Sequence, residues 1–182
     1  MNPSPHDVFG TEEDRWCWDK YIAQCDLIEL TESDRQLVKA SFQYLRQVLG
    51  EGFLRRADQQ RNPLFFWYFR NAAPRARLSM TRFVDALRAL EGANNYDRLL
   101  RRIKRPKNFD HDLAEADSLI EVAHKFSCSG FDVEFEPSVH VTNVHRVVRT
   151  KKPDLKVLDG KTGQEVYVEV SCLRKSAGQN LT

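Results

Sequence analysis

The apolar residues of this 182-residue chain change their spacing near Gly130, and that change constrains the fold more than any other feature. From about Thr31 to Phe126 they recur at intervals of three and four, which is the period of amphipathic helices. After Gly130 apolar and acidic residues alternate, as they do in a half-buried strand. The chain is therefore expected to be α+β, with a helical part first and a small sheet after it.

The first long helix is expected to begin at a capping residue, Thr31 or Ser33, and to carry one apolar stripe. Gly50 and Gly52 are expected either to loosen this helix or to end it, and Pro74 suits the first turn of a later helix. The stripe consists of Val38, Phe42, Leu45, Leu49 and Phe53. The aromatic run at residues 65–69 is expected to pack in a core rather than to stack on bases.

The second half predicts the order helix, strand, strand, strand. A helix over residues 110–127 ends near Gly130, and the strands cover residues 131–137, 153–158 and 165–173. The last two strands form a hairpin across a turn rich in Gly and Asp, and a polar segment separates the first strand from the second. A small three-stranded sheet, mixed or antiparallel, is expected from this pattern.

The distribution of charge divides the chain at other positions than the apolar spacing does. The formal net charge is +2, but residues 1–34 carry −7, residues 35–107 carry +12 and residues 108–182 carry −3. We therefore expect a helical domain at residues 1–106, with a basic segment at 35–107, and a second domain at 107–182. The basic segment is expected to contact the phosphate backbone of nucleic acid, and the alternative is a set of solvated helix surfaces. The densest basic run contains Arg98, Arg101, Arg102, Lys104 and Arg105.

The sequence also limits location. Its longest apolar run covers residues 64–69, far short of the roughly 20 residues that span a bilayer, and no secretory signal follows Met1. The four cysteines are scattered and form no zinc-ligand pattern, which favours reduced thiols. We expect a cytoplasmic protein that does not enter a membrane.

Three acidic residues are expected to meet at one end of the sheet. Asp154 begins one hairpin strand, and Glu169 interrupts an apolar run in the partner strand, where a carboxylate is costly without a partner. Glu115 shares the apolar face of the preceding helix, and Asp112 is a substitute on nearly the same face. A divalent cation is one partner that suits such carboxylates.

These residues resemble the PD-(D/E)xK nuclease superfamily, which has the restriction-endonuclease-like fold. The resemblance rests on Pro153-Asp154, on Glu169-Val170-Ser171 and on the preceding helix, and it covers about residues 108–175. It implies a phosphodiesterase that uses Mg²⁺ or Mn²⁺. Asp154 and Glu169 would bind the metal, Val170 would offer its carbonyl, and Glu115 would complete the site.

The chain departs from the family pattern in two places. Ser171 stands where the family has a lysine, and Lys156 is expected to substitute for it, with Lys152 and Lys175 as alternatives. Only eleven residues follow Ser171, whereas the family core adds a helix and a strand. The sheet is therefore expected to be abbreviated, to belong to a fragment, or to be completed by a partner such as a second copy. A nuclease-like module without activity, which binds nucleic acid or protein, is the alternative function.

Overall fold

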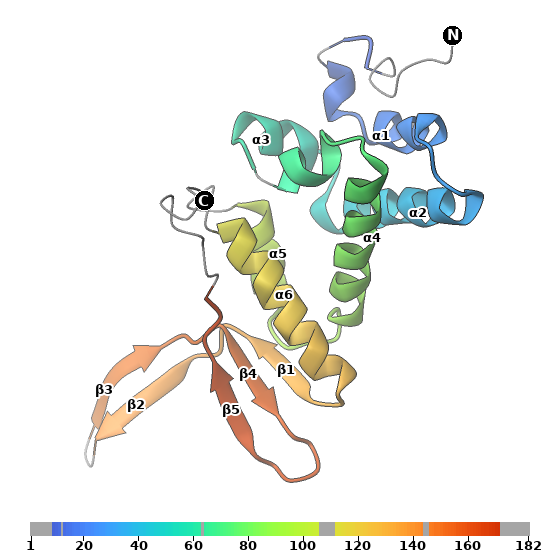
Figure 1. The fold of residues 1–182 in the computed structure, drawn as a ribbon. Helices are drawn as coiled ribbons and strands as arrows, with labels where there is room; N and C mark the ends of the chain where they lie inside the picture. Colours follow the sequence, from blue (N-terminus) through green and yellow to red (C-terminus); the bar gives the residue numbers. More distant parts are fainter. Residues whose placement is uncertain (1–8, 12, 63, 106–111, 144–145, 172–182) are drawn as a thin grey trace, which may run out of the picture.

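The computed structural model describes residues 9–11, 13–62, 64–105, 112–143 and 146–171, and it confirms the α+β class. The helical part precedes the sheet in the chain, as Figure 1 shows. Its elements are η2 (Glu13–Trp16), α1 (Trp18–Gln24), η3 (Cys25–Leu27), α2 (Glu32–Leu49), α3 (Phe53–Gln59), η4 (Phe65–Phe69), α4 (Pro74–Ala89), α5 (Tyr96–Lys104) and α6 (Asp112–Cys128). The strands are β1 (Asp132–Phe135), β2 (Val139–Asn143), β3 (Arg146–Lys151), β4 (Leu155–Leu158) and β5 (Glu165–Val168).

Local signals set several helix ends. Thr31 caps α2, because its Oγ1 accepts a hydrogen bond from the backbone N–H of Asp34 at 3.1 Å. Pro74 occupies the first turn of α4, where its missing N–H costs nothing. Gly130 follows α6 with a φ of 85°, a left-handed conformation that glycine adopts without strain. The predictions at these three positions are confirmed.

The core of the helical part is aromatic. Two residues of the run at 65–69, Phe65 and Phe69, are buried, and both rings contact Tyr21, so core packing is confirmed for them. Trp67 in the same run is 47% exposed. The fully buried aromatic side chains near this centre are Trp18, Tyr21, Phe42, Phe53, Phe65 and Phe69.

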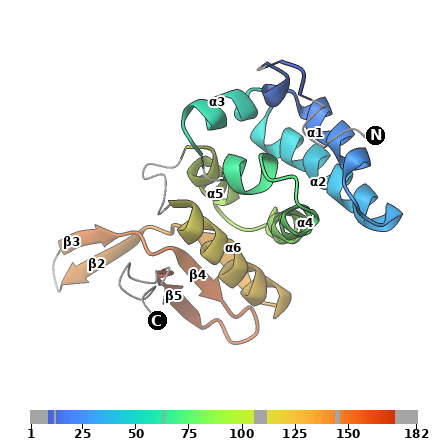
Figure 2. The same cartoon turned by 45° about the horizontal axis from the view of Figure 1, so that its top comes forward.

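The buried core continues from the helices into the sheet. It includes Leu87 on α4, Leu119 on α6, and Phe135 and Leu155 on the strands, and Figures 1 and 2 show α6 between α4 and the sheet. The expected domain boundary at residues 106–107 lies outside the described residues. On either side of it, one hydrophobic cluster joins residues of both expected domains.

The three-stranded sheet is antiparallel, with the order β1-β4-β5. Val133, Phe135, Leu155 and Val157 are buried on its inner face, whereas Val166 and Tyr167 on the edge strand β5 are 58% and 46% exposed. Among the described residues, β5 pairs on one side only. None of the helices in the described ranges is long and apolar enough to cross a bilayer.

Two strand predictions need correction. The polar segment after β1 forms a second sheet, the β2–β3 hairpin, which projects away from the helices in Figure 1. The last strand was expected over residues 165–173, but β5 ends at Val168. The last residue pair between β4 and β5 is Leu155 with Val168. Pro153, two residues before Leu155, has no backbone N–H with which to extend the pairing.

Candidate acidic site

Helix α5 is held at both of its ends, by strand β1 before its first turn and by Asn62 at its last turn. The backbone N–H of Asn94 donates to the carbonyl of Val133 at 3.1 Å, and the N–H of Phe135 donates to the carbonyl of Asn94 at 2.9 Å. At the other end, the buried Asn62 side chain donates from Nδ2 to the carbonyl of Ile103 at 3.0 Å. These bonds fix both ends of α5, and its last turn contacts α6 and the start of β4 through Arg102.

Arg102, on that last turn, joins two of the three predicted carboxylates. Its Nη2 lies 2.9 Å from Glu115 Oε2 on α6, and its Nη1 lies 3.1 Å from Asp154 Oδ1 before β4. The three side chains are 21%, 32% and 19% exposed, so the cluster is largely shielded from water. The structure therefore brings Glu115 and Asp154 to a single guanidinium.

Asp154 is held from a second direction. Its Oδ2 accepts a hydrogen bond from the backbone N–H of Val170 at 2.9 Å, and its carbonyl accepts one from the N–H of Glu136 at 2.9 Å. Because Leu155 pairs with Val168 in the antiparallel register, Asp154 and Glu169 occupy the next opposed positions. The two motifs thus meet at the open end of the β4–β5 hairpin.

Glu169 follows β5 and is exposed. Within the described ranges, no group of three or more acidic, His or Cys residues is arranged to hold a metal ion. The side chain of the alternative ligand Asp112 lies outside the described set. The fixed part of the donor set is therefore the Glu115–Asp154 pair.

The donor chemistry of that pair fits Mg²⁺ or Mn²⁺. Carboxylate oxygens are the hard ligands that Mg²⁺ prefers, and one or two of them with water and phosphate oxygens make an ordinary Mg²⁺ site. One oxygen of each carboxylate faces Arg102, so a cation there requires the guanidinium to move. Glu169 and Val170 follow β5 next to Asp154 at the end of the hairpin, and their oxygens are the remaining donors that the sequence predicts.

The pKa of the Arg102 guanidinium depends on burial and on its two carboxylate partners. Burial lowers the pKa of its guanidinium, but the hydrogen bonds and charges of Asp154 and Glu115 outweigh burial and leave the pKa raised. Arg102 is thus a fixed cation between two acids.

Lys156 does not join this cluster. Its Nζ lies 2.5 Å from Glu165 Oε1, and its register partners on the sheet are Glu134 and Tyr167. Lys156 and the buried Leu155 point to opposite faces of the sheet, because side chains alternate along a strand. Asp154 precedes the strand and contacts Arg102 on α5, so it does not share a face with Lys156. Of the alternatives, Lys152 is exposed and Lys175 lies outside the described residues.

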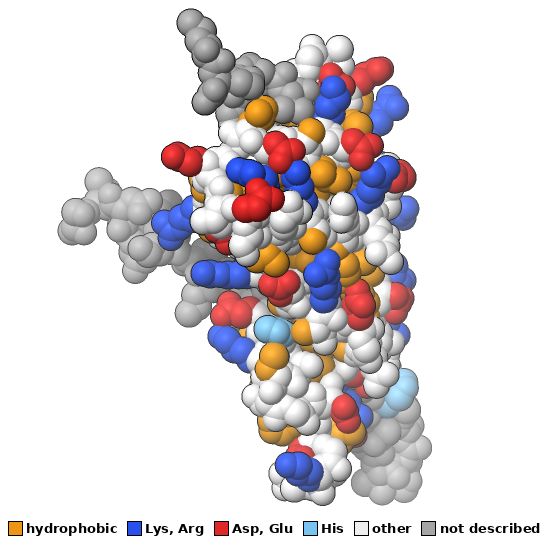
Figure 3. All heavy atoms as spheres, turned by 90° about the vertical axis from the view of Figure 1, so that its right-hand side faces the viewer, with side chains coloured by type: hydrophobic (Ala, Val, Ile, Leu, Met, Phe, Trp, Pro, Cys, Tyr) orange, Lys and Arg blue, Asp and Glu red, His pale blue; other side chains and the backbone are white. Residues whose placement is uncertain are grey.

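The other basic residues of α5 have different surroundings. Arg98 donates to the carbonyl of Glu136, and Arg101 forms an exposed i,i+4 ion pair with Asp97 at 2.8 Å. Burial lowers the pKa of Lys104, and nearby Arg56 adds to this effect, while Arg105 is exposed at the helix end. On the α4 side, Figure 3 shows acidic and basic side chains interspersed rather than one uniformly basic face.

The sequence had placed Arg102 among residues that contact nucleic acid and had not paired it with the acids. The spacing in α5 could have indicated this contact. Arg102 lies three residues after Leu99 and next to Ile103, the two buried residues of the helix, and so lies on the side of α5 that packs against other elements. Comparisons of the chain with protein-family models, curated proteins and solved structures found no match.

Proposed function

We propose that this protein is a metal-dependent phosphodiesterase of the nuclease type, acting on nucleic acid. The observation that supports this proposal most is the convergence of Glu115 and Asp154 on Arg102, 13 and 52 residues away along the chain. The Val170 amide adds the Glu169-Val170 segment to the same place. The resemblance to the PD-(D/E)xK superfamily implies a site of Glu115, Asp154 and Glu169, and the proximity of the first two supports that part of the proposal.

In the proposed reaction, Glu115, Asp154, Glu169 and the Val170 carbonyl would hold Mg²⁺ or Mn²⁺. A bound cation of this kind lowers the pKa of an attacking water and offsets charge on the phosphate. The Val170 N–H keeps Asp154 oriented, because it fixes the carboxylate oxygen that does not face Arg102. Partial burial of the two carboxylates limits competition from bulk water.

Arg102 takes the place of the cation missing at Ser171. In the free protein it neutralises the two carboxylates, and with a metal held by them its planar fork would be available to contact a phosphate oxygen. Lys104 and Arg105 continue the basic run at the end of α5, on the path of the substrate backbone. Contacts of this kind position nucleic acid without reading its sequence.

The direct test is cleavage of single-stranded DNA, duplex DNA and RNA with Mg²⁺, with Mn²⁺ and with EDTA. We expect metal-dependent cleavage that falls at least about 100-fold in Asp154→Asn and Glu169→Gln, since each removes a ligand charge. Asp132→Asn, an exposed acid on β1, is the matched control and should keep full activity. Cleavage that persists in both site variants contradicts the assigned site.

One observation favours a second candidate, a nuclease-like module that binds nucleic acid without cutting it. Arg102 already supplies the counter-charge of both carboxylates, and no three-acid group is formed by the described residues. In that case we expect no cleavage with either metal, and the Tm should not change when Mg²⁺ is added. Binding should still weaken with salt and with Arg102→Gln, Lys104→Gln and Arg105→Gln, because phosphate contacts release counterions. Binding that ignores salt would leave a protein partner instead.

A further inference from the structure

The β2–β3 hairpin forms an arm, residues 137–153, that the acidic cluster does not use. Figures 1 and 2 show it projecting away from the helices and from the sheet of β1, β4 and β5. Of the side chains at 138–140 and 150–152, which the structure describes, none joins the hydrophobic core. A two-stranded hairpin gains little stability on its own, so an arm of this kind is suited to contact a partner.

The arm carries charge of one sign. Residues 137–153 contain four basic residues and no aspartate or glutamate, whereas the rest of the block at 108–182 carries −7. The four lie on β3 or directly after it, and they are Arg146, Arg149, Lys151 and Lys152. The side chains of Lys151 and Lys152 are exposed. A polyanion is the partner that complements such a surface.

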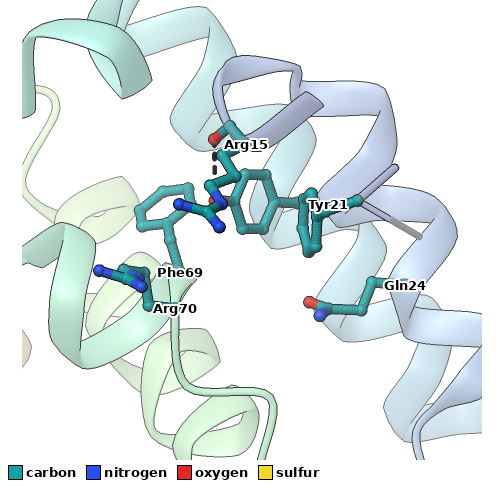
Figure 4. A pocket seen from close by; sticks show the side chains of 6 residues that line it. Arg15, Tyr21, Gln24, Phe69 and Arg70 are labelled. Carbon is teal, nitrogen blue, oxygen red and sulfur yellow. Dashed lines mark hydrogen bonds between the residues drawn. The ribbon is translucent and has the colours of Figure 1, made fainter. Parts of the chain in front are cut away.

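Arginines of the helical part have different surroundings, because they pack against the aromatic core. Figure 4 shows Arg15 and Arg70 beside Tyr21 and Phe69, at a pocket of about 180 Å³. The guanidinium of Arg70 lies 5.3 Å from the ring centre of Phe66, as expected for a cation–π contact. Charge in this region therefore contributes to the packing of the helices, whereas the lysines of the arm lie outside the core.

The base of the arm adjoins the acidic cluster. The backbone N–H of Glu136, before β2, donates to the carbonyl of Asp154, after β3, at 2.9 Å, and this bond closes the arm. Arg98 on α5 donates to the carbonyl of Glu136, and Arg102 on the same helix donates to the Asp154 carboxylate at 3.1 Å. Asp154 thus belongs both to the base of the arm and to the candidate site, so a nucleic acid bound along the arm would lie next to that site.

We propose that the arm binds duplex DNA in the major groove. Two strands about 4.8 Å apart form a ribbon that a groove about 12 Å wide admits, whereas the minor groove, about 6 Å wide, is too narrow for it. The major groove of an RNA duplex is deep and narrow, and a single strand has no groove. This inference rests on the proposed function for the class of its partner, nucleic acid, and adds that the substrate is duplex DNA.

Fluorescence anisotropy of the full chain in EDTA measures binding without cleavage. The probes are a short dye-labelled DNA duplex, the RNA duplex of the same sequence and one of the DNA strands alone. We expect the DNA duplex to bind at least about tenfold more tightly than either of the others, because only its groove accepts the ribbon. Equal affinity for the DNA duplex and for the RNA duplex or the single strand overturns the proposal.

The double variant Lys151→Gln/Lys152→Gln locates the binding on the arm. It is expected to weaken binding of the DNA duplex about tenfold or more, and to reduce the slope of log K against log salt by about 2, because two phosphate contacts are lost. Lys161→Gln, at an exposed lysine in the turn between β4 and β5, is the matched control and should leave both quantities unchanged. Circular dichroism checks that the variants fold. Equal binding by the double variant and the parent overturns the proposal.

Dimethyl sulfate footprinting identifies the groove, because this reagent methylates guanine N7, which lies in the major groove. The parent is expected to protect N7 positions that the double variant leaves reactive, and a bound duplex with every N7 reactive overturns the placement in that groove. Failure of the proposed function is a separate result. A chain that binds DNA through the arm but cuts none with Mg²⁺ or Mn²⁺ contradicts the activity and retains the arm, whereas metal-dependent cleavage with normal DNA binding by the double variant contradicts the arm alone.

Discussion

Asp154 Oδ2 accepts a hydrogen bond from the backbone N–H of Val170 at 2.9 Å, which joins the two halves of the predicted motif through one bond. The strand ladder has already ended one pair earlier, at Leu155 and Val168. The side chain of Asp154 therefore replaces the backbone acceptor that a longer β4 would supply. The other carboxylate oxygen of Asp154, Oδ1, accepts a hydrogen bond from Arg102.

The Arg102–Asp154 pair should contribute measurably to stability because both side chains are about one-fifth exposed. In a double-mutant cycle with Arg102→Met and Asp154→Asn, urea unfolding is expected to give a coupling energy of about 1–2 kcal/mol. Each single variant should cost about 1–3 kcal/mol, since it leaves a charged partner without its hydrogen bond.

The chain offers a matched control for this cycle. Arg101 and Asp97 lie on the same helix at 2.8 Å, but their side chains are 69% and 73% exposed. Their coupling energy should stay below about 0.5 kcal/mol, because solvent screens exposed pairs. Equal coupling in the two cycles would mean that the Arg102 cluster is no more than a surface contact.

Residues with local effects were predictable from the sequence, and residues placed by tertiary contacts were not. Thr31, Pro74 and Gly130 act on their own turns, so their patterns located helix ends correctly. The contact of Glu115 with Arg102 depends on how α5 packs against α6, and no spacing along the chain encodes that crossing. The β2–β3 hairpin escaped prediction because polar and charged residues separate its few apolar ones and its register shifts between Val141 and Thr142.

Asp117 on α6 should make stability depend on pH. Burial raises the pKa of its carboxyl, and the charge of Glu121 adds to the rise. The folded state therefore holds this proton more tightly than the unfolded state, so stability is highest below the unfolded pKa of about 4 and falls as pH rises through the folded pKa. Asp117→Asn should remove that fall and stabilise the protein at pH 7 by about 0.5–1 kcal/mol.

Thermal unfolding of the parent and of Asp117→Asn at pH 4 and pH 7 measures this effect. The difference in Tm should be small at pH 4 and larger at pH 7. Asp85→Asn, an exposed aspartate on α4, is the control and should show no such growth. A difference in Tm that is the same at both pH values would refute the assignment to Asp117.

The described cysteines should differ in reactivity. Cys25 is fully buried, its Sγ donates to the carbonyl of Tyr21, and burial raises the pKa of its thiol to about 11. Cys128 is exposed at the end of α6, with its Sγ 3.2 Å from His124 Nε2. Because the thiolate is the reactive form, alkylation by iodoacetamide at pH 8 should modify Cys128 at least about 100-fold faster than Cys25.

Peptide mapping by mass spectrometry follows both sites in one sample. In urea the two rates should converge, since unfolding removes the burial of Cys25. Rapid modification of Cys25 in the folded protein would contradict its placement in the core.

Arg77 should be essential for the packing of η4 against α4 and α1. Its guanidinium donates to two carbonyls on η4, those of Tyr68 and Phe69, and to Gln24 Oε1 on α1. It also lies 4.8 Å from the ring centre of Phe42 on α2. Lysine keeps the charge but cannot reach several acceptors with one planar fork, so Arg77→Lys is expected to lower the free energy of unfolding by about 2–4 kcal/mol. Arg75→Lys, an exposed change two residues earlier, should alter it by less than about 0.5 kcal/mol. Urea unfolding of both variants makes the comparison, and a small effect of Arg77→Lys would show that the three acceptors are satisfied without the guanidinium.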